Sequence, residues 1–123
     1  MDDSPTLTVE LGADPPSYRP GDRIDGVAGW QLDKAARWVE VRLFWRTAGK
    51  GDEDAVIVDS VRYDEPGEVD ARAFSFVAPT GPFSYEGRLI EIAWGVEVVA
   101  RRAKQTARIT LTLSSTGEAV RPS

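Results

Sequence analysis

Residues 74–100 read FSFVAPTGPFSYEGRLIEIAWGVEVVA and combine two alternating phenylalanines, a proline-rich segment and a long apolar stripe. From residue 90 to residue 100 every second side chain is apolar, which is the period of a β-strand. Pro79 and Pro82 cannot donate ladder hydrogen bonds, and Gly87 permits a bend where the stripe begins. A phosphate-binding glycine loop would instead lead into the N-terminus of a helix. The stretch therefore predicts a corner at which the chain changes sheets and enters a long strand.

The same alternation of apolar and polar residues governs most of the chain, and Gly, Pro or Asp bounds each alternating run. Strands are predicted at residues 6–11, 22–32, 37–47, 55–63, 69–78, 90–100 and 106–113. Residues 13–21 contain three prolines and are predicted to be a connection. About seven strands with turn signals at this spacing are typical of an immunoglobulin-like antiparallel β-sandwich. The expected fold class is therefore all-β.

Two stretches together resemble the arrestin-like family, which includes arrestins, the retromer cargo-binding subunits and bacterial sporulation-control proteins. The first, YRPGDRIDGVAGWQL at residues 18–32, is similar to the family's aromatic-x-Pro-Gly-acidic turn and the glycine-containing strand after it. The second is residues 74–100, which resemble the family's Phe-x-Phe strand, its Pro-Ser-Phe/Tyr-x-Gly turn and its long following strand. Here Phe83 stands between Pro82 and Ser84. The resemblance covers residues 6–113, the extent of one sandwich lobe.

The resemblance implies an arrestin-like fold and a general role as a non-catalytic scaffold that binds other proteins through loops and sheet edges. Arrestins usually carry two lobes, so functions that need a cleft between lobes do not transfer to one lobe. Receptor-binding arrestins also sense phosphate with basic residues on the first strand, whereas residues 6–11, TLTVEL, contain none. The implied role is a regulatory interaction module or adaptor.

The length of the chain, its net charge and the residue types that it lacks argue against several classes of function. The 123 residues fit a single domain, 1–123, with a core at 6–113 and a tail at 114–123 that is expected to fray. A net charge of -5 argues against a dedicated nucleic-acid binder. The sequence has no cysteine and no histidine, which removes thiolate, Ser-His-Asp and histidine-metal chemistry. We therefore expect no cofactor and no enzymatic activity.

The N-terminal sequence MDDSPTLTVEL is acidic and lacks the basic start and apolar run of a signal peptide. No apolar stretch approaches the roughly 20 residues that a membrane-spanning helix needs. These features predict a cytoplasmic protein without a membrane span. The composition is also compatible with a bacterial source.

Acidic clusters leave one metal-binding alternative open. Asp52, Glu53 and Asp54 form one cluster, and the second comprises Asp64, Glu65, Glu68 and Asp70. Either could supply oxygen ligands for Ca²⁺, although neither follows a known ligand spacing. Solvated turn charges are the favoured interpretation. A calcium-dependent or carbohydrate-binding module remains an alternative, as does a hydrolase with two carboxylates.

Six residues are candidates for contact with a partner. Trp38 and Phe44 lie on the more polar side of their predicted strand and could form an aromatic patch. A basic cluster near a predicted hairpin loop comprises Arg101, Arg102, Lys104 and Arg108. We expect the partner to be a protein, or a second copy in a homodimer or a larger self-assembled structure, met through a sheet edge or the loops.

Overall fold

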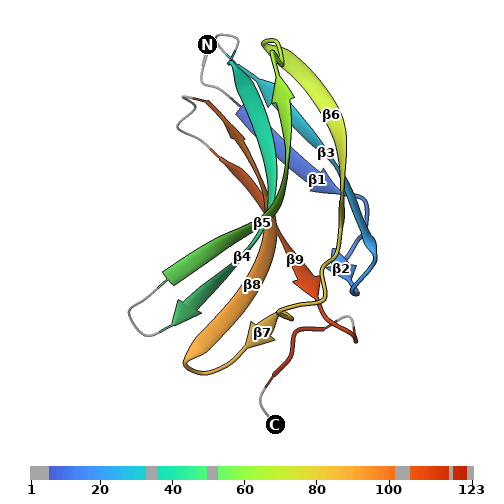
Figure 1. The fold of residues 1–123 in the computed structure, drawn as a ribbon, viewed down its shortest axis with the longest axis vertical. Coiled ribbons are helices and arrows are strands. Elements are labelled where there is room, and N and C mark those ends of the chain that lie inside the picture. The colour runs from blue at the N-terminus through green and yellow to red at the C-terminus, as the bar shows by residue number, and fades with distance from the viewer. Residues whose placement is uncertain (1–5, 33–35, 50–52, 102–105, 117, 122–123) are drawn as a thin grey trace.

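The computed structural model describes residues 6–32, 36–49, 53–101, 106–116 and 118–121. These residues form nine strands and no helix, arranged as two sheets packed face to face (Figure 1). The strands are β1 (Thr6–Leu11), β2 (Ser17–Tyr18), β3 (Arg23–Gln31), β4 (Trp38–Gly49), β5 (Glu53–Asp64), β6 (Val69–Val77), β7 (Tyr85–Glu86), β8 (Ile90–Ala100) and β9 (Ala107–Leu113). The predicted all-β sandwich is confirmed, and its seven longer strands match the seven that the sequence predicts.

The small sheet has the strand order β1-β3-β6, and both pairs are antiparallel. The large sheet has the order β2-β9-β8-β4-β5, and β7 pairs with the first part of β8, beyond the end of β9. One detail of the sequence prediction is wrong. Ser17 and Tyr18, in the segment expected to be purely a connection, form a short strand parallel to β9. The two preceding prolines lack an N–H, but these two residues can still pair.

The core lies where the inward faces of the two sheets meet. Alternating positions of each long strand point inward, because successive side chains of a strand face opposite sides of the sheet. Burying one such side chain stabilises the fold by about 1.5–3 kcal/mol. The main contributors are Ile24, Ala28 and Trp30 from β3, Phe74 and Phe76 from β6, Val39, Val41 and Leu43 from β4, and Trp94, Val96 and Val98 from β8.

The proline-rich segment is the predicted corner. The chain leaves β6 in the small sheet, passes through residues 78–84, and enters β7 and β8 of the large sheet. The buried indole N–H of Trp94 donates a hydrogen bond to the carbonyl oxygen of Pro82 at 2.6 Å. The hydroxyl of Ser84 accepts one from the backbone N–H of Leu113 at 2.9 Å. These bonds fix the corner against both β8 and β9.

Part of the C-terminal segment pairs with β7. Val120 forms a parallel bridge to Tyr85, with hydrogen bonds from Val120 N to Ser84 O and from Glu86 N to Val120 O. Arg121 pairs with the Glu86 carboxylate at 3.0 Å. These contacts give backbone groups of residues 84–86 hydrogen-bond partners in addition to the pairing of β7 with β8.

One end of the large sheet extends past the small sheet. In Figure 1 the lower parts of β4, β5 and β8 swing away from β1, β3 and β6. We call this part the wing and define it as residues 45–49, 53–58 and 88–92. Because the small sheet does not cover it, the apolar stripe of β8 is buried only from Trp94 onward, while Ile90 is 48% exposed. The exposed large apolar side chains of the wing are Val56, Ile57, Val58, Leu89 and Ile90.

Candidate interaction surface

The outer face of the large sheet carries a row of charged side chains across three strands. Arg42 on β4 lies directly opposite Glu97 on β8, which lies directly opposite Arg108 on β9. Side chains of residues paired in this way point to the same face and come close enough to interact. Strand register therefore creates a ladder of alternating charge.

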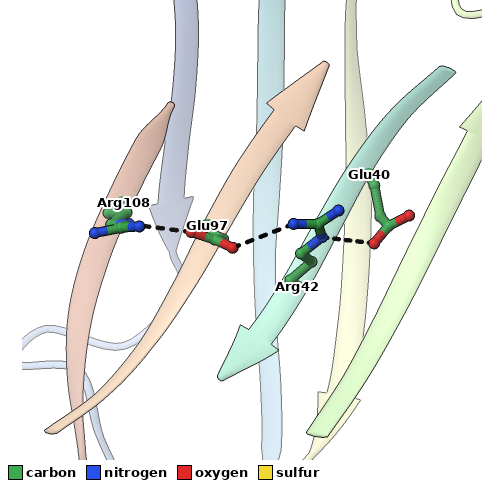
Figure 2. A network of polar contacts seen from close by, with 4 residues as sticks. All are labelled: Glu40, Arg42, Glu97 and Arg108. Atoms are coloured by element: carbon green, nitrogen blue, oxygen red, sulfur yellow. Dashed lines mark hydrogen bonds and ion pairs between the residues drawn. The ribbon is translucent and has the colours of Figure 1, made fainter. Parts of the chain in front are cut away.

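Figure 2 shows that the ladder continues to a fourth residue, Glu40. The Arg42 guanidinium lies 2.6 Å from the Glu40 carboxylate and 3.7 Å from that of Glu97, and Arg108 lies 3.0 Å from Glu97. The Glu97 side chain is only 11% exposed, whereas that of Arg108 is 64% exposed. Glu97 is thus a nearly buried anion held between two cations, and Arg108 is the member of the ladder that a partner can reach.

Phe44, a predicted contact residue, lies beside this ladder and is buried. Its ring is covered by Arg108, whose guanidinium carbon lies 5.6 Å from the ring centroid. Below the ring is Gly95, directly opposite Phe44 on β8, and any Cβ there would lie 2.9 Å from the ring. With 7% of its surface exposed, Phe44 mainly packs the outer face and offers little area for contact.

Trp38, the other predicted aromatic contact, is partly exposed at the start of β4. The Arg62 guanidinium of β5 lies 5.0 Å from the centroid of its ring. The backbone N–H of Arg101 donates a hydrogen bond to the Trp38 carbonyl oxygen at 3.2 Å. The structure thus brings Trp38 and Arg101 together, whereas Arg108 lies farther along the sheet beside Phe44. Arg102 and Lys104 lie outside the described residues.

The open edge of the large sheet lies outside the six predicted contact residues. β5 is the last strand in the order β2-β9-β8-β4-β5, so one side of its backbone has no neighbouring strand among the described residues. The first eight of its 12 residues are all exposed. The sequence does contain one sign of this edge, the apolar run Ala55-Val56-Ile57-Val58. Four consecutive apolar residues depart from the alternation expected of a strand that buries only one face.

The two ends of β5 differ in how they are held. At its C-terminal end the Tyr63 hydroxyl donates a hydrogen bond to the Ala73 carbonyl oxygen of β6 at 3.0 Å. A β-bulge at Val58 interrupts the pairing with β4, because Leu43 pairs with Asp59 and Phe44 with Ile57. The bulge separates the tethered half of β5 from the half that belongs to the wing.

Other features add little binding chemistry. A shallow hollow of about 320 Å³ lies at the tip of the wing between residues 48–49 and 87–91. Within the described residues, no three His, Cys, Asp or Glu side chains are grouped so that they could hold a metal ion. No helix long and apolar enough to cross a membrane occurs in this part of the chain either.

Comparison with known proteins identifies the fold. No family model and no curated protein sequence matches this chain. Spo0M, a sporulation control protein from Bacillus subtilis, matches with a TM-score of 0.65 and 16% identity over 91% of this chain and 50% of the Spo0M chain. The chain thus shares a sandwich fold with Spo0M and spans half of its length.

Two further solved structures match more weakly. Superoxide reductase (neelaredoxin) from Ignicoccus hospitalis has a TM-score of 0.47 at 9% identity, over 90% of this chain and 80% of that one. The β-glucosidase EmGH1 from Erythrobacter marinus has a TM-score of 0.49 at 17% identity, over 90% of this chain and 15% of that one. These likenesses are too weak to bear on function.

Proposed function

We propose that this chain is a non-catalytic cytoplasmic adaptor of the arrestin-like type that binds a protein partner through the open edge of β5. The observation that carries the proposal is the exposed apolar run at residues 55–58 on that edge. An edge strand presents unpaired N–H and C=O groups, to which an extended segment of another chain can add as a further strand. Main-chain hydrogen bonds then supply affinity, and the side chains of the edge supply specificity.

Two further observations support the proposal. The likeness to Spo0M supports the fold on which it rests, and the two family-like stretches lie at the turn before β3 and at the corner after β6. The exposure of the first eight residues of β5 is also an unusual feature, because proteins commonly cover or shorten such edges to prevent unwanted pairing. A retained open edge is therefore a reasonable site for a partner.

The direct test is capture of partners from a lysate of the native host with the wild-type chain and two matched variants. Ile57→Lys places a charge on the edge, where the side chain is 52% exposed. Val27→Lys places the same charge on β3, which has a neighbour on each side and where Val27 is 45% exposed. We expect Ile57→Lys to lose a partner that the wild type and Val27→Lys both retain. Equal capture by all three folded proteins would contradict the edge as the binding site.

The outer face of the large sheet offers a second contact region. The same capture experiment distinguishes binding at this face from binding at the edge of β5. The accessible candidates there are Trp38, Arg101 and Arg108. Loss of the partner from a folded Trp38→Ala or Arg108→Ala variant, with normal capture by Ile57→Lys, would move the site to this face. Arg102 and Lys104 stay in the proposal as neighbouring basic residues.

Self-assembly is the alternative function, because an open edge can also pair with a second copy. Sedimentation velocity over a hundredfold range of concentration distinguishes the two. An adaptor is expected to give one discrete species, a monomer or a dimer, whereas an assembly subunit would grow steadily with concentration.

A further inference from the structure

The half of β5 that lies in the wing carries an ordered pattern of charge. Pairing with β4 sets Asp54 opposite Thr47, Val56 opposite Trp45, and Asp59 opposite Leu43. Leu43 and Trp45 both belong to the face of β4 that points toward the core. Because directly paired residues share a face, Asp54, Val56 and Asp59 all project to this inner side. The pattern along the edge is therefore acidic, apolar, acidic.

The two carboxylates of this pattern lack a cationic partner among the described residues, and Asp59 accepts a hydrogen bond from the backbone N–H of Ser60 at 2.8 Å. Asp54 and Asp59 form no ion pair with any residue that the structure describes, and both are exposed. Their neighbour Glu53 projects to the other face and is paired with Arg46 at 3.5 Å. Both acids therefore stay available to a cation on a strand that adds to β5.

We propose that the wing half of β5 binds an extended segment with the pattern basic-x-apolar-x-basic, in which alternate residues face Asp54, Val56 and Asp59. This inference rests on the proposed function, since it names the class of partner that the edge would accept. Alternate side chains of an added strand lie on one face of the sheet. The first basic residue, the apolar residue and the second basic residue of the segment must therefore stand at positions i, i+2 and i+4. Lys or Arg opposite each aspartate gives a favourable cross-strand pair, and an apolar residue packs on Val56.

A second copy of β5 is a poor occupant of the same edge. Antiparallel pairing of two wing halves with Val56 facing Val56, and with Val58 left out of the ladder by the bulge, puts Asp59 of one copy opposite Asp54 of the other. Like charges directly opposite destabilise a strand pair. Charge complementarity therefore favours a basic partner segment over self-pairing.

The first test uses two synthetic peptides, acetyl-Thr-Lys-Thr-Val-Thr-Lys-Thr-amide and the same sequence with Glu in place of Lys, titrated by NMR into the full chain. The lysine peptide should bind and the glutamate peptide should not. Asp54→Asn with Asp59→Asn should weaken the lysine peptide about fivefold, as expected for the loss of two exposed ion pairs. Asp54→Lys with Asp59→Lys should reverse the preference, so that the glutamate peptide binds better.

A matched variant controls for net charge. Glu10→Lys with Glu68→Lys changes the net charge by the same amount as Asp54→Lys with Asp59→Lys. Its two positions are exposed and lie outside β5. This variant should keep the preference for the lysine peptide. If it reverses the preference as well, long-range attraction explains binding and the pattern on the edge does not.

Methylation of the peptide backbone tests whether the segment binds as a strand. Only alternate N–H groups of an added strand point toward β5. One peptide is therefore N-methylated at the two lysines and the valine, and a second at the two inner threonines. We expect one of these peptides to lose binding and the other to bind nearly as well as the unmodified peptide. Equal effects of the two modifications would overturn strand addition.

The outcomes also separate this inference from the proposed function. If the lysine peptide fails to bind while Ile57→Lys still abolishes capture of a partner, the adaptor proposal stands and the basic pattern is wrong. If neither result is obtained, both proposals fail. Dimerisation that Ile57→Lys abolishes, with no peptide binding, would identify a second copy as the occupant and overturn the inference.

Discussion

The hydroxyl of Tyr63 on β5 donates a hydrogen bond to the carbonyl oxygen of Ala73 on β6 and so joins the edge strands of the two sheets. The Tyr63 ring also lies 5.9 Å from the ring of Trp30, a core residue of β3. This contact holds the C-terminal half of β5 against the small sheet. The wing half, beyond the bulge at Val58, has no such tether among the described residues.

Replacing Tyr63 with Phe should weaken the junction between the sheets. The substitution keeps the ring and removes one hydrogen bond, so the free energy of unfolding should fall by about 1 kcal/mol. Urea denaturation measures the change. Tyr85→Phe is a suitable control and should stay within about 0.5 kcal/mol of wild type, because no hydrogen bond of the Tyr85 hydroxyl to a described residue is present.

The same tyrosine predicts how stability depends on alkaline pH. Burial raises the pKa of Tyr63 above its ordinary value, although the nearby Arg72 acts in the opposite direction. A folded-state pKa above the unfolded value of about 10 contributes stability that is fully present below pH 10 and is lost as the pH rises through the folded-state pKa. Burial raises the pKa of Tyr18 as well, so it shares this behaviour.

Tyr63→Phe should therefore reduce the loss of unfolding free energy between pH 9 and pH 11 but not abolish it, since Tyr18 remains. Denaturation at the two pH values, for wild type and variant, provides the measurement. An identical alkaline loss in both proteins would show that Tyr63 does not contribute to the dependence.

Glu97→Gln should destabilise the large sheet. The amide keeps the shape of the side chain but leaves the Arg42 and Arg108 guanidinium groups without their shared anion. We expect a loss of about 2 kcal/mol, the usual scale for hydrogen bonds to a charged group that is largely buried. Glu91→Gln, on the exposed part of the same strand, should cost less than about 0.5 kcal/mol. Equal stability of the two variants would mean that the ladder is energetically neutral.

Gly95→Ala tests the packing of Phe44 on the outer face. A Cβ at this position would lie 2.9 Å from the Phe44 ring and 3.0 Å from the Ile109 carbonyl oxygen. The ring or the strand must shift, at a cost of about 1–3 kcal/mol. Gly12→Ala is the control, since its nearest contact would be an ordinary 3.5 Å from the Asp25 carbonyl oxygen. A melting temperature lowered only in Gly95→Ala is the expected result.

Local pattern was enough to predict the strands and the corner. Alternation in residues 37–47 and 90–100 assigned the inward side chains of β4 and β8, and Pro79 and Pro82 located the change of sheet. The extent of the wing could not be predicted in this way. Ile90 continues the same apolar stripe as Trp94, and alternation does not reveal where the opposing sheet ends.

The candidate surface depended on information that a single sequence lacks. The ladder from Glu40 to Arg108 exists because three strands adopt a particular register, which joins residues far apart in the chain. Burial of Phe44 likewise depends on Gly95 and Arg108 lying beside it. Strand order, which no local pattern specifies, determines that β5 is an edge.

Hydrogen exchange of the backbone amides, in the free chain and in its complex with a captured partner, tests the edge most directly. Strand addition at β5 should slow exchange at alternate amides of residues 53–58, because new main-chain hydrogen bonds form there, and should leave β6 unchanged. Slower exchange confined to β8, β9 or the small sheet, with β5 unchanged, would contradict binding at this edge.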